Sequence, residues 1–563
     1  MAPGLLYVTM QPHASLSAAQ FHDWYNNEHG PLRLQLSVFH NGFRYRATDG
    51  DPNSPNPYDS TKPEWLALYD VDDAADLTRP PYTTLREPTV QSEREVHTFN
   101  QVTMNRQFYD FVREWKAPDY KHLEDLDADA EGAVLVAVCF KIKPGTEAEL
   151  DRWYNEEHVE LLTKVPGWRR SRRFVTASVL NPTPETKEYL ALHEYAPQNG
   201  LGGPEFTAAV STPFSKHIFE DVVVERKRRV YQWFYTFGPA PRDLKSLSTP
   251  GYNSVFVSRD EKTRTYTASH SPTHRAVIES YVTTADRVDI QYRLEGSKDP
   301  EAPLIVLINS ILSDWGIWDE FLDLFFASPQ NLKYRVLRYR PRGRVNDGGS
   351  IPVTLDLLTQ DVIALLDALR VRKAAAIIGV SLGGATALNA ALKYPSRLDA
   401  FISCDTSSAA VPGATEAWAE RIALAESDDN APKDKTGARL VGDKLAEATV
   451  RRWFPPDNFD GGIRQGRVQK VKEFVRTNNL EGFKRTVAAL YDYDLREEMK
   501  TATVRGTFVV GSGDGVLPTS MKTMAAEYGA GTSLNVIDDA GHLPMTEQPS
   551  RFVEVVNDFL RGT

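Results

Sequence analysis

Short runs of apolar residues alternate with helix-forming stretches through the second half of this chain. Each run has the length of one strand and is apolar at consecutive positions. Strands buried on both faces have this continuous pattern, whereas strands with one exposed face alternate apolar and polar residues. The pattern predicts an α/β domain with a largely parallel sheet, whose strands include residues 304–308, 334–338, 374–378, 398–404, 506–511 and 533–537.

The first half of the chain contains an internal repeat. The segment FHDWYNNEH at residues 21–29 recurs as LDRWYNEEH at residues 150–158. The order of apolar runs and helix formers around each segment predicts a β-α-β-β-α-β ferredoxin-like module, and a period of about 130 residues is too long for a solenoid. The strand-like runs are 5–10, 43–47, 64–69 and 102–112 in the first copy, and 133–142, 168–175, 188–193 and 222–237 in the second.

Chain length supports this division. A single hydrophobic core stops growing near about 250–300 residues, so a chain of 563 residues needs more than one core. Acidic residues cluster at 117–131, and Pro, Ser and Thr are frequent at 238–274, which indicates connecting segments. The predicted domains are a first module at 1–116, a second at 130–240, a linker at 241–273 and an α/β domain at 274–563 with a cap at about 408–500.

Composition limits the partners. A formal net charge of −11 argues weakly against nucleic acid. Only Cys139 and Cys404 are present, both inside apolar runs, so we expect no disulfide framework and a reducing compartment. Residues 1–12 lack a basic start, and no segment has the roughly 18 apolar residues of a membrane span. We expect a cytoplasmic protein with a small-molecule substrate, and leave open whether it forms a homo-oligomer.

Ser381 lies in the pentapeptide GVSLG, directly after an apolar run and directly before a helix-forming stretch. A serine hydroxyl is a weak nucleophile, so it must be raised on a sharp turn within reach of a histidine and two backbone donors. Flanking glycines permit that turn because they carry no Cβ. A chance match in a loop is the alternative, but the strand before and the helix after the motif favour a nucleophile elbow.

Two further residues follow in the chain order that such a triad needs. Asp514 comes after the apolar run 506–511, and His542 comes after the run 533–537. His542 would accept the Ser381 proton, and Asp514 would fix the histidine tautomer. Asp405, which follows the run 398–404, is the competing acid, and a solvated turn is the structural alternative for Asp514.

A second oxyanion donor is expected in the loop after residues 304–308. In this position the chain reads Asn309-Ser310-Ile311. The backbone N–H groups of Ile311 and Leu382 are the candidate donors for a developing oxyanion.

These motifs, together with the segments 452–454, 482–495 and 541–544, resemble the 3-oxoadipate enol-lactonase branch of the α/β hydrolases over about residues 274–561. The resemblance implies an α/β-hydrolase fold with a helical cap, catalysis by Ser381, Asp514 and His542, and lactone opening through an acyl-serine. It also implies that the loop and cap residues Asn309, Ser310, Arg452, Trp453 and Phe454 lie near the substrate.

Two features leave substrate selection open. Arg452 could pair with a substrate carboxylate or could lie on an exposed helix face. The loop at 339–344 reads YRPRGR, whereas the family usually has an aspartate and a histidine around Arg-Gly. This basic loop could select a larger or more acidic ligand.

The pattern W-Y-N-x-E-H resembles the EthD-like group of dimeric α/β barrel proteins. In that fold two modules close their sheets into one barrel, and a tandem pair can do so within one chain. The resemblance implies that His29 and His158 contact a ligand or act as acid and base. The structural alternative is that Trp24 and Trp153 fill the core while the Glu and His side chains stabilise the helix end.

Two functions follow from the sequence. In the first, the chain is a serine hydrolase for a lactone, an ester or an activated carbon–carbon bond, and the barrel is a scaffold or shapes the substrate site. In the second, the barrel is itself a cofactor-independent decarboxylase or cyclase-type catalyst coupled to the hydrolase. No metal is expected, because the His and carboxylate residues are already explained by these motifs, and no Gly-rich phosphate loop indicates a nucleotide cofactor.

Overall fold

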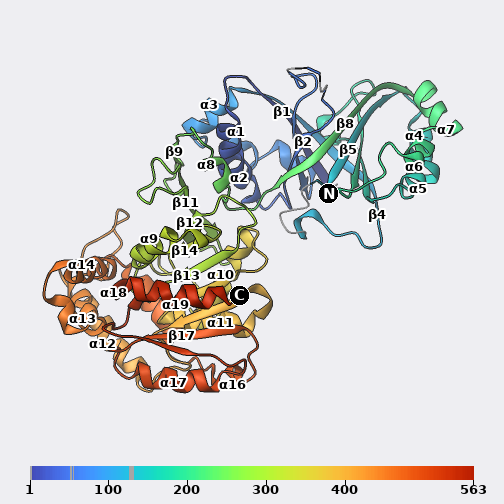
Figure 1. The fold of residues 1–563 in the computed structure, drawn as a ribbon. Coiled ribbons are helices and arrows are strands. Elements are labelled where there is room, and N and C mark those ends of the chain that lie inside the picture. The colour runs from blue at the N-terminus through green and yellow to red at the C-terminus, as the bar shows by residue number, and fades with distance from the viewer. Residues whose placement is uncertain (1–2, 51–52, 55, 126–131, 563) are drawn as a thin grey trace. The chain divides into compact units, whose positions relative to one another are not determined.

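The computed structural model describes residues 3–50, 53–54, 56–125 and 132–562. The chain divides into two compact units, Met1–Pro241 and Arg242–Thr563 (Figure 1). The expected connection between the two modules, residues 117–131, lies partly outside the described residues, because 126–131 are not described.

The first unit is a closed barrel of eight strands in the order β1-β3-β2-β8-β5-β7-β6-β4. Every neighbouring pair is antiparallel, including the two contacts between the copies, β2 with β8 and β4 with β6. Joining the copies in this way leaves no unpaired sheet edge. The strands are β1 (Gly4–Pro12), β2 (Phe43–Ala47), β3 (Trp65–Val71), β4 (Val102–Lys116), β5 (Val134–Ile142), β6 (Trp168–Thr176), β7 (Tyr189–Tyr195) and β8 (Val223–Thr236).

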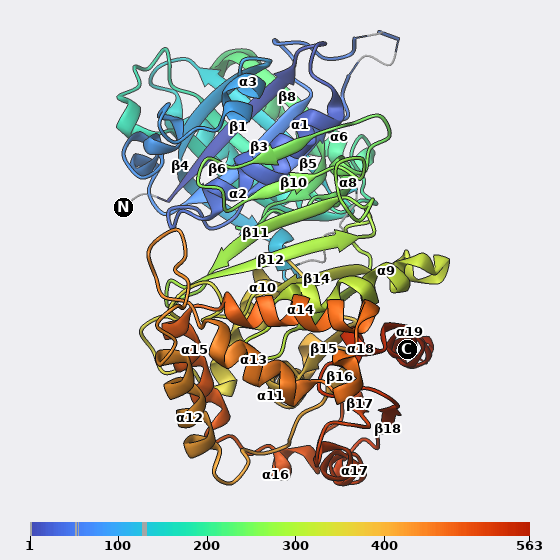
Figure 2. The ribbon, with the colours of Figure 1, turned by 90° about the vertical axis from the view of Figure 1, so that its left-hand side faces the viewer.

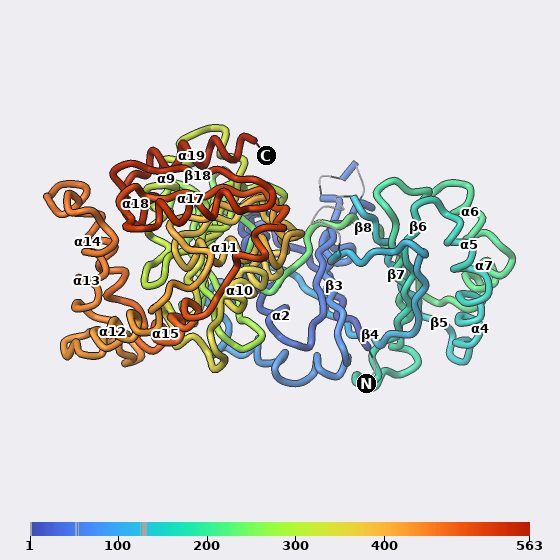
Figure 3. Tube along the Cα trace, turned by 90° about the horizontal axis from the view of Figure 1, so that it is seen from below, coloured from blue at the N-terminus to red at the C-terminus, as the bar shows by residue number. Residues whose placement is uncertain are grey.

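The helices of each copy gather on one side of the barrel, those of the first copy opposite those of the second (Figures 1 and 3). In both copies a five-residue π-helical segment, Tyr25–His29 or Tyr154–His158, continues the first helix. The order of strands and helices in each copy is the expected one. The α-helices are α1 (Ala18–Trp24), α2 (Gly30–Leu34) and α3 (Glu93–Phe99), then α4 (Glu147–Trp153), α5 (Val159–Leu162), α6 (Pro204–Val210) and α7 (Pro213–His217).

Strand alternation divides the apolar side chains of this unit into three layers. One face of every strand points into the barrel and forms a core that includes Tyr45, Leu68 and Trp233. The other face packs against the helices, where Trp24 and Trp153 are almost fully buried. The repeated tryptophans therefore fill equivalent places between helix and sheet.

The second unit has a ten-stranded sheet in the order β18-β17-β16-β15-β13-β14-β12-β11-β10-β9. The six strands from β18 to β14 are parallel, and β12 to β9 continue the sheet in antiparallel pairs. Residues 241–273, expected as a linker, contribute β9 and β10 to this sheet. The strands are β9 (Val255–Val257), β10 (Arg264–Tyr266), β11 (Val277–Thr283), β12 (Asp289–Gly296), β13 (Leu304–Ile308), β14 (Arg335–Tyr339), β15 (Ala376–Val380), β16 (Ala400–Cys404), β17 (Arg505–Gly511) and β18 (Leu534–Ile537).

Helices cover both faces of this sheet. The pair α9 (Asp319–Ala327) and α19 (Pro549–Arg561) packs on one face, and the pair α10 (Leu355–Ala368) and α11 (Leu382–Lys393) on the other (Figure 3). The helices α8, α17 and α18 span Leu244–Leu247, Leu517–Glu527 and Pro544–Glu547. Among the described residues, no helix is both long and apolar enough to span a membrane.

The insertion between β16 and β17 is helical and forms a cap along one margin of the unit (Figures 1 and 2). Its helices pack on one another, α12 on α13 and α13 on α14. The cap helices are α12 (Ala414–Glu426), α13 (Asp443–Trp453), α14 (Gly462–Arg476), α15 (Leu480–Thr486) and α16 (Arg496–Met499).

Candidate active site

Ser381 lies between the end of β15 and the start of α11, with φ 59° and ψ −120°. This positive φ is unfavourable for a residue with a Cβ, so the turn around Ser381 is strained. The flanking glycines are sterically required: a Cβ on Gly379 would lie 1.9 Å from the carbonyl oxygen of Gly383. The sequence therefore raises a partly exposed serine on a tight strand-to-helix turn.

The loop after β13 packs directly against this turn. A Cβ on Gly383 would lie 2.5 Å from the carbonyl oxygens of both Ile308 and Asn309. Leu382 is the first residue of α11, where a backbone N–H has no partner within the helix. The two candidate oxyanion donors, Leu382 and Ile311, thus belong to segments in close contact.

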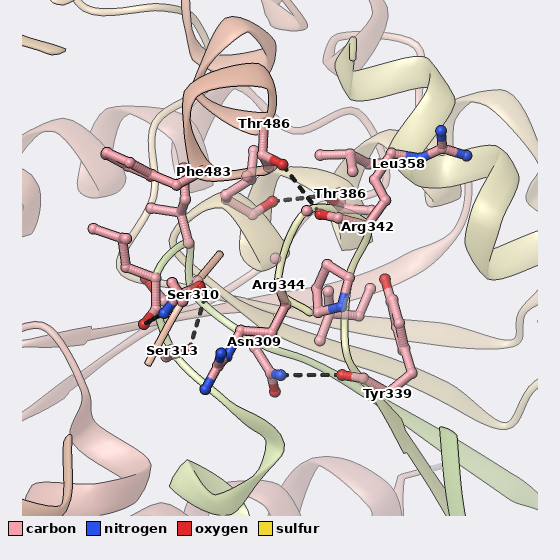
Figure 4. Close-up of a pocket in the computed structure, with 18 residues that line it drawn as sticks. Asn309, Ser310, Ser313, Tyr339, Arg342, Arg344, Leu358, Thr386, Phe483 and Thr486 are labelled. Carbon is pink, nitrogen blue, oxygen red and sulfur yellow. Dashed lines mark hydrogen bonds between the residues drawn. The ribbon is translucent and has the colours of Figure 1, made fainter. Parts of the chain in front are cut away.

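The side chain of Asn309 holds this loop in place. Its amide nitrogen donates to the carbonyl oxygen of Tyr339 at 3.0 Å, and its amide oxygen accepts from the indole of Trp318 at 2.9 Å (Figure 4). Both ends of the amide are therefore occupied by protein groups. Asn309, expected beside the substrate, fixes the loop backbone in this structure.

His542 and Asp514 meet at the carboxyl ends of the last two strands. Nδ1 of His542 lies 2.7 Å from Oδ2 of Asp514, and their side chains are 12% and 15% exposed. Ser381, Asp514 and His542 thus lie at the same edge of the parallel sheet, after β15, β17 and β18. Among the described residues no hydrogen bond joins Ser381 to His542, a bond that in hydrolases often forms only with substrate in place.

Asp405, the competing acid, lies at the end of β16 between the strands that carry Ser381 and Asp514. It is 1% exposed, and its Oδ1 accepts from the backbone N–H of Gly511 at 2.9 Å. Within the described part of the chain, no N–H or hydroxyl donor reaches its Oδ2. Burial, followed by repulsion from Asp514, raises the pKa of Asp405 well above its usual range. A hydrogen bond between the two carboxyl groups therefore has Asp405 as the protonated donor.

Glu547 holds the loop of the candidate base from the other side. Its Oε2 accepts from the N–H of Gly541 and its Oε1 from the N–H of Leu543, each at 3.0 Å. These two amides flank His542 in the chain. Burial raises the pKa of Glu547 to about 7. No sequence motif predicted a role for Glu547, although it follows His542 by five residues in the chain.

The cap contacts the loop of His542 through the expected segment. The indole of Trp453 stacks on the His542 ring with centroids 5.3 Å apart, and its carbonyl accepts from the His542 N–H at 2.8 Å. Phe454 is buried beside it. Trp453 therefore limits the positions available to the imidazole, whereas Phe454 serves the packing of the cap.

Arg452 is exposed at the end of α13, where Asp514 acts on it electrostatically. Partial desolvation by the surrounding protein, followed by repulsion from Arg421, lowers the pKa of Arg452 to about 10. Both guanidinium groups lie over the Trp418 ring, at 4.5 Å for Arg421 and 5.8 Å for Arg452. Neither forms an ion pair with any residue that the structure describes. Nothing in the sequence selects Arg421 or Trp418, because residues 414–425 show only a run of helix formers.

The basic loop after β14 is largely neutralised by the protein itself. Arg340 pairs with Asp314 at 2.9 Å, and Arg342 pairs with Asp361 at 2.6 Å and with Asp286 at 2.8 Å. Arg344 shares Asp314 with Arg340, at 3.1 Å. Of the three arginines in this loop, Arg344 alone shares its acid with another arginine, so most of the positive charge of the loop is paired within the described residues.

In the barrel, His29 is paired with an acid. Its Nδ1 lies 2.8 Å from Oε1 of Glu95, which also accepts from the Trp24 indole. Burial lowers the pKa of His29 to about 4, and despite burial the neighbouring His29 and Arg33 hold that of Glu95 at about 2. The pair is therefore a neutral imidazole beside a carboxylate at neutral pH.

His158 occupies the equivalent place in the second copy with different partners. Its Nδ1 lies 3.1 Å from the carbonyl oxygen of Ala209, and its ring stacks on Trp153 with centroids 4.0 Å apart. The Trp153 indole donates to Ser215 at 3.1 Å, so a serine stands where the first copy has Glu95. Burial lowers the pKa of His158 to about 4. Among the described residues, no group of three His, Cys, Asp or Glu side chains is arranged to hold a metal ion.

Comparison with known proteins places the second unit among relatives. Residues 305–555 match the model of the Alpha/beta hydrolase family. The chain is 26% identical over 279 residues to 3-oxoadipate enol-lactonase 2 from Acinetobacter baylyi, covering 49% of this chain and 95% of the relative. With 3-oxoadipate enol-lactonase 1 from the same organism it is 28% identical over 262 residues, covering 46% and 90%.

One solved structure with a similar sequence is a hydrolase from Pseudomonas aeruginosa PA01. It is 31% identical, and the match covers 50% of this chain and 98% of that chain, with a TM-score of 0.43.

Proposed function

We propose that this chain, whose residues 305–555 belong to the Alpha/beta hydrolase family and are related to 3-oxoadipate enol-lactonases, is a serine hydrolase that opens a lactone or cleaves a related ester. One observation carries the proposal: Ser381 on its strained turn lies at the same sheet edge as the hydrogen-bonded side chains of His542 and Asp514. Ser381, His542 and Asp514 could also cleave an activated carbon–carbon bond next to a carbonyl group.

The proposed chemistry begins when His542 Nε2 takes the proton of Ser381 as the hydroxyl attacks the carbonyl carbon. Asp514 keeps the other proton of the imidazole on Nδ1 and stabilises the imidazolium. The N–H groups of Leu382 and Ile311 would then stabilise the oxyanion. His542 returns the proton to the leaving oxygen, which in a lactone stays attached to the acyl chain, and water then releases the acyl group from Ser381.

Two arginines in the cap favour a substrate that carries a negative charge. Arg421 and Arg452 repel each other, stack on Trp418 and have no acidic partner among the described residues. A carboxylate between them would relieve this repulsion, and a planar guanidinium can bind it in a bidentate manner. We therefore propose a carboxylated lactone or ester as the substrate class.

For the first unit we propose two tandem ferredoxin-like modules of the EthD type that act as a scaffold. The strand order within each copy, β4-β1-β3-β2 and β8-β5-β7-β6, supports this assignment. The second candidate function, a catalytic barrel, is favoured by one observation, the pair of His29 and Glu95. A neutral imidazole held by a carboxylate has the electronic arrangement of a general base.

Labelling with a fluorophosphonate probe tests the hydrolase proposal. We expect an adduct on Ser381 in the folded chain, and its loss in Ser381→Ala and in His542→Ala. The control is Ser313→Ala, which changes a nearby serine whose hydroxyl donates to the carbonyl of Ser310. Folded protein without an adduct on Ser381 would refute an activated serine.

A further inference from the structure

A recess lies at one end of the barrel, where β6 ends and β7 begins. Its volume is about 440 Å³, within the range of about 300–1,000 Å³ that is typical of small-molecule sites. The wall includes Tyr109 of β4, Lys141 of β5, and Asn181, Glu185 and Glu188 of the loop between β6 and β7. Strand β4 belongs to the first copy, and the other segments belong to the second. The recess therefore exists only because the two copies share one barrel.

Glu188 is held in place by two donors from β4. Its Oε2 accepts from the Gln107 side-chain amide at 2.8 Å and from the Tyr109 hydroxyl at 3.0 Å. Among the described residues, no N–H or O–H group donates to its Oε1, and no cation lies close enough for an ion pair. A carboxylate oxygen can accept about two hydrogen bonds. Because Glu188 is only half-buried, its Oε1 is available to a ligand in the recess.

Charged groups of both signs stand around the recess. Lys141 pairs with Glu225 at 2.8 Å, and Lys227 pairs with the same acid at 2.9 Å. Glu188 acts on both lysines electrostatically, so the two lysines and the two glutamates together carry no net charge. The remaining charged residues of the wall also have opposite signs, Arg106 and Glu185. An ion of either sign would meet like charges as well as opposite ones, which favours an uncharged ligand.

Uncharged polar groups continue the wall beyond Glu188. Asn181 is exposed, and its side-chain amide makes no hydrogen bond with any residue that the structure describes. The hydroxyls of Thr183 and Thr186 lie 3.3 Å apart on the same loop. Amide and hydroxyl groups both donate and accept, whereas an ionised carboxylate only accepts. A ligand that matches all of these groups needs several polar groups that can donate and accept, and hydroxyl groups do both.

We propose that this recess binds an uncharged polyhydroxylated molecule of about the size of a mono- or disaccharide, with one ligand hydroxyl donating to Oε1 of Glu188. Asn181 would form a hydrogen bond with a second hydroxyl. The described residues that line the recess include neither His29 nor His158, and all of them belong to the first unit. The barrel would then have a ligand site of its own, independent of the serine hydrolase proposal and of these two histidines.

Saturation-transfer NMR of the full-length chain at pH 6 tests the charge argument. Glucose is uncharged, glucosamine carries an ammonium group and glucuronate carries a carboxylate, on rings of the same size. Galactose, mannose and maltose extend the uncharged set, because the arrangement of hydroxyl groups differs between sugars. We expect at least one uncharged sugar to bind more tightly than glucosamine and glucuronate.

Variants of the recess wall test the contacts. Glu188→Ala should weaken binding of that sugar by about tenfold, since it removes a hydrogen bond to a charged group. Asn181→Gly should weaken it by about fivefold, because it removes a neutral hydrogen bond, and glycine suits the φ of 48° at this position. Glu205→Ala is the matched control, because Glu205 is an exposed acid on α6 of the same copy and lies outside the recess wall.

Three results would overturn the site. They are no binding of any uncharged sugar, tighter binding of glucosamine or glucuronate than of every uncharged sugar, and dissociation constants in both wall variants equal to that of the control. If circular dichroism shows that Glu188→Ala does not fold, Asn181→Gly decides, and an unchanged dissociation constant in that variant refutes the site.

Discussion

In the barrel, the pair of His29 and Glu95 lies inside the packed layers, whereas in the hydrolase unit the pair of His542 and Asp514 lies in loops where parallel strands end. His29 and Glu95 are 3% and 4% exposed, against 12% and 15% for His542 and Asp514. The same kind of pair is enclosed in one unit and open to a ligand in the other.

The two copies within the barrel sharpen this contrast. The second copy keeps the tryptophan, the histidine and the fold, but it has Ser215 in place of Glu95. Because the same fold forms with Glu95 in the first copy and Ser215 in the second, it does not require an acid at this position. A reacting atom can reach a histidine–carboxylate pair only where the pair is accessible, and His542 with Asp514 is the more accessible of the two pairs.

The largest expected effect comes from Ser381→Ala. It should lower kcat for ester hydrolysis by about 10⁴-fold or more, because the remaining site keeps only binding and oxyanion stabilisation. Steady-state kinetics with p-nitrophenyl esters measure this loss. The paired change His29→Ala with His158→Ala should leave the same activity within about threefold, provided thermal unfolding shows a folded barrel. If ester turnover depended on His29 and His158, the distinction between a structural pair in the barrel and a catalytic pair in the hydrolase unit would be wrong.

A smaller effect is expected at Asp405. Asp405→Asn keeps a donor towards Asp514 and should retain activity within about threefold. Asp405→Leu removes the donor and should lower kcat by about tenfold, the effect of one hydrogen bond to a charged group.

The pH dependence of kcat distinguishes a hydrogen-bonding role of Asp405 from a role in packing alone. The pKa of Asp405 is raised, so its proton is lost only as the pH rises, and the charge then formed repels Asp514. We expect activity of the unmodified chain to fall on the alkaline side and Asp405→Asn to remove that fall. Identical profiles for both proteins would refute a protonated Asp405.

The two units should also respond to pH in opposite directions. Burial lowers the pKa of His29 and His158 to about 4 and that of His193 to about 3, against about 6.5 unfolded. The contribution of these neutral histidines to the free energy of unfolding is complete above pH 6.5 and is lost as the pH falls towards 4. Glu547 has the opposite sign: its pKa is raised to about 7, so its contribution is complete below about 4.5 and is lost as the pH rises through 7.

Hydrogen exchange of the full-length chain between pH 4 and 8 measures this difference. Amides of the barrel should lose protection first in acid, and amides 541–547 first in base. Replacing His158 and His193 with leucine should reduce the acid response of the barrel. Equal acid responses of the two units would contradict the assignment of neutral buried histidines.

The smallest effect is expected from Glu95→Ser, which gives the first copy the residue of the second. We expect a change of about 1 kcal/mol in the free energy of unfolding, typical of a single substitution with a substitute hydrogen bond for Trp24. The pKa of His29 should fall further, because the attraction of the carboxylate is lost, and NMR titration can follow it. A loss of all folded protein would mean that the first copy depends on the pair.

Several features could be expected from local sequence because they depend on neighbours in the chain. The glycines around Ser381 indicate a strand-to-helix turn, and the repeated W-Y-N-x-E-H segment indicates two related modules. The predicted α/β-hydrolase domain related to enol-lactonases is confirmed by the family match. The assignment of the first half as EthD-like stays a prediction.

Other features depend on groups that meet only in the folded chain. Nothing near Asp405 in the sequence shows that it faces Asp514, and nothing near Arg344 shows that Asp314 is shared with Arg340. The sequence by itself determined the elements, the repeat and the order of the candidate triad, because periodicity and steric limits act over a few residues. Only the tertiary structure decided which charges are paired, which donors lack a partner and which histidine lies at an open strand end, because burial and electrostatic pairing depend on distances between segments remote in the chain.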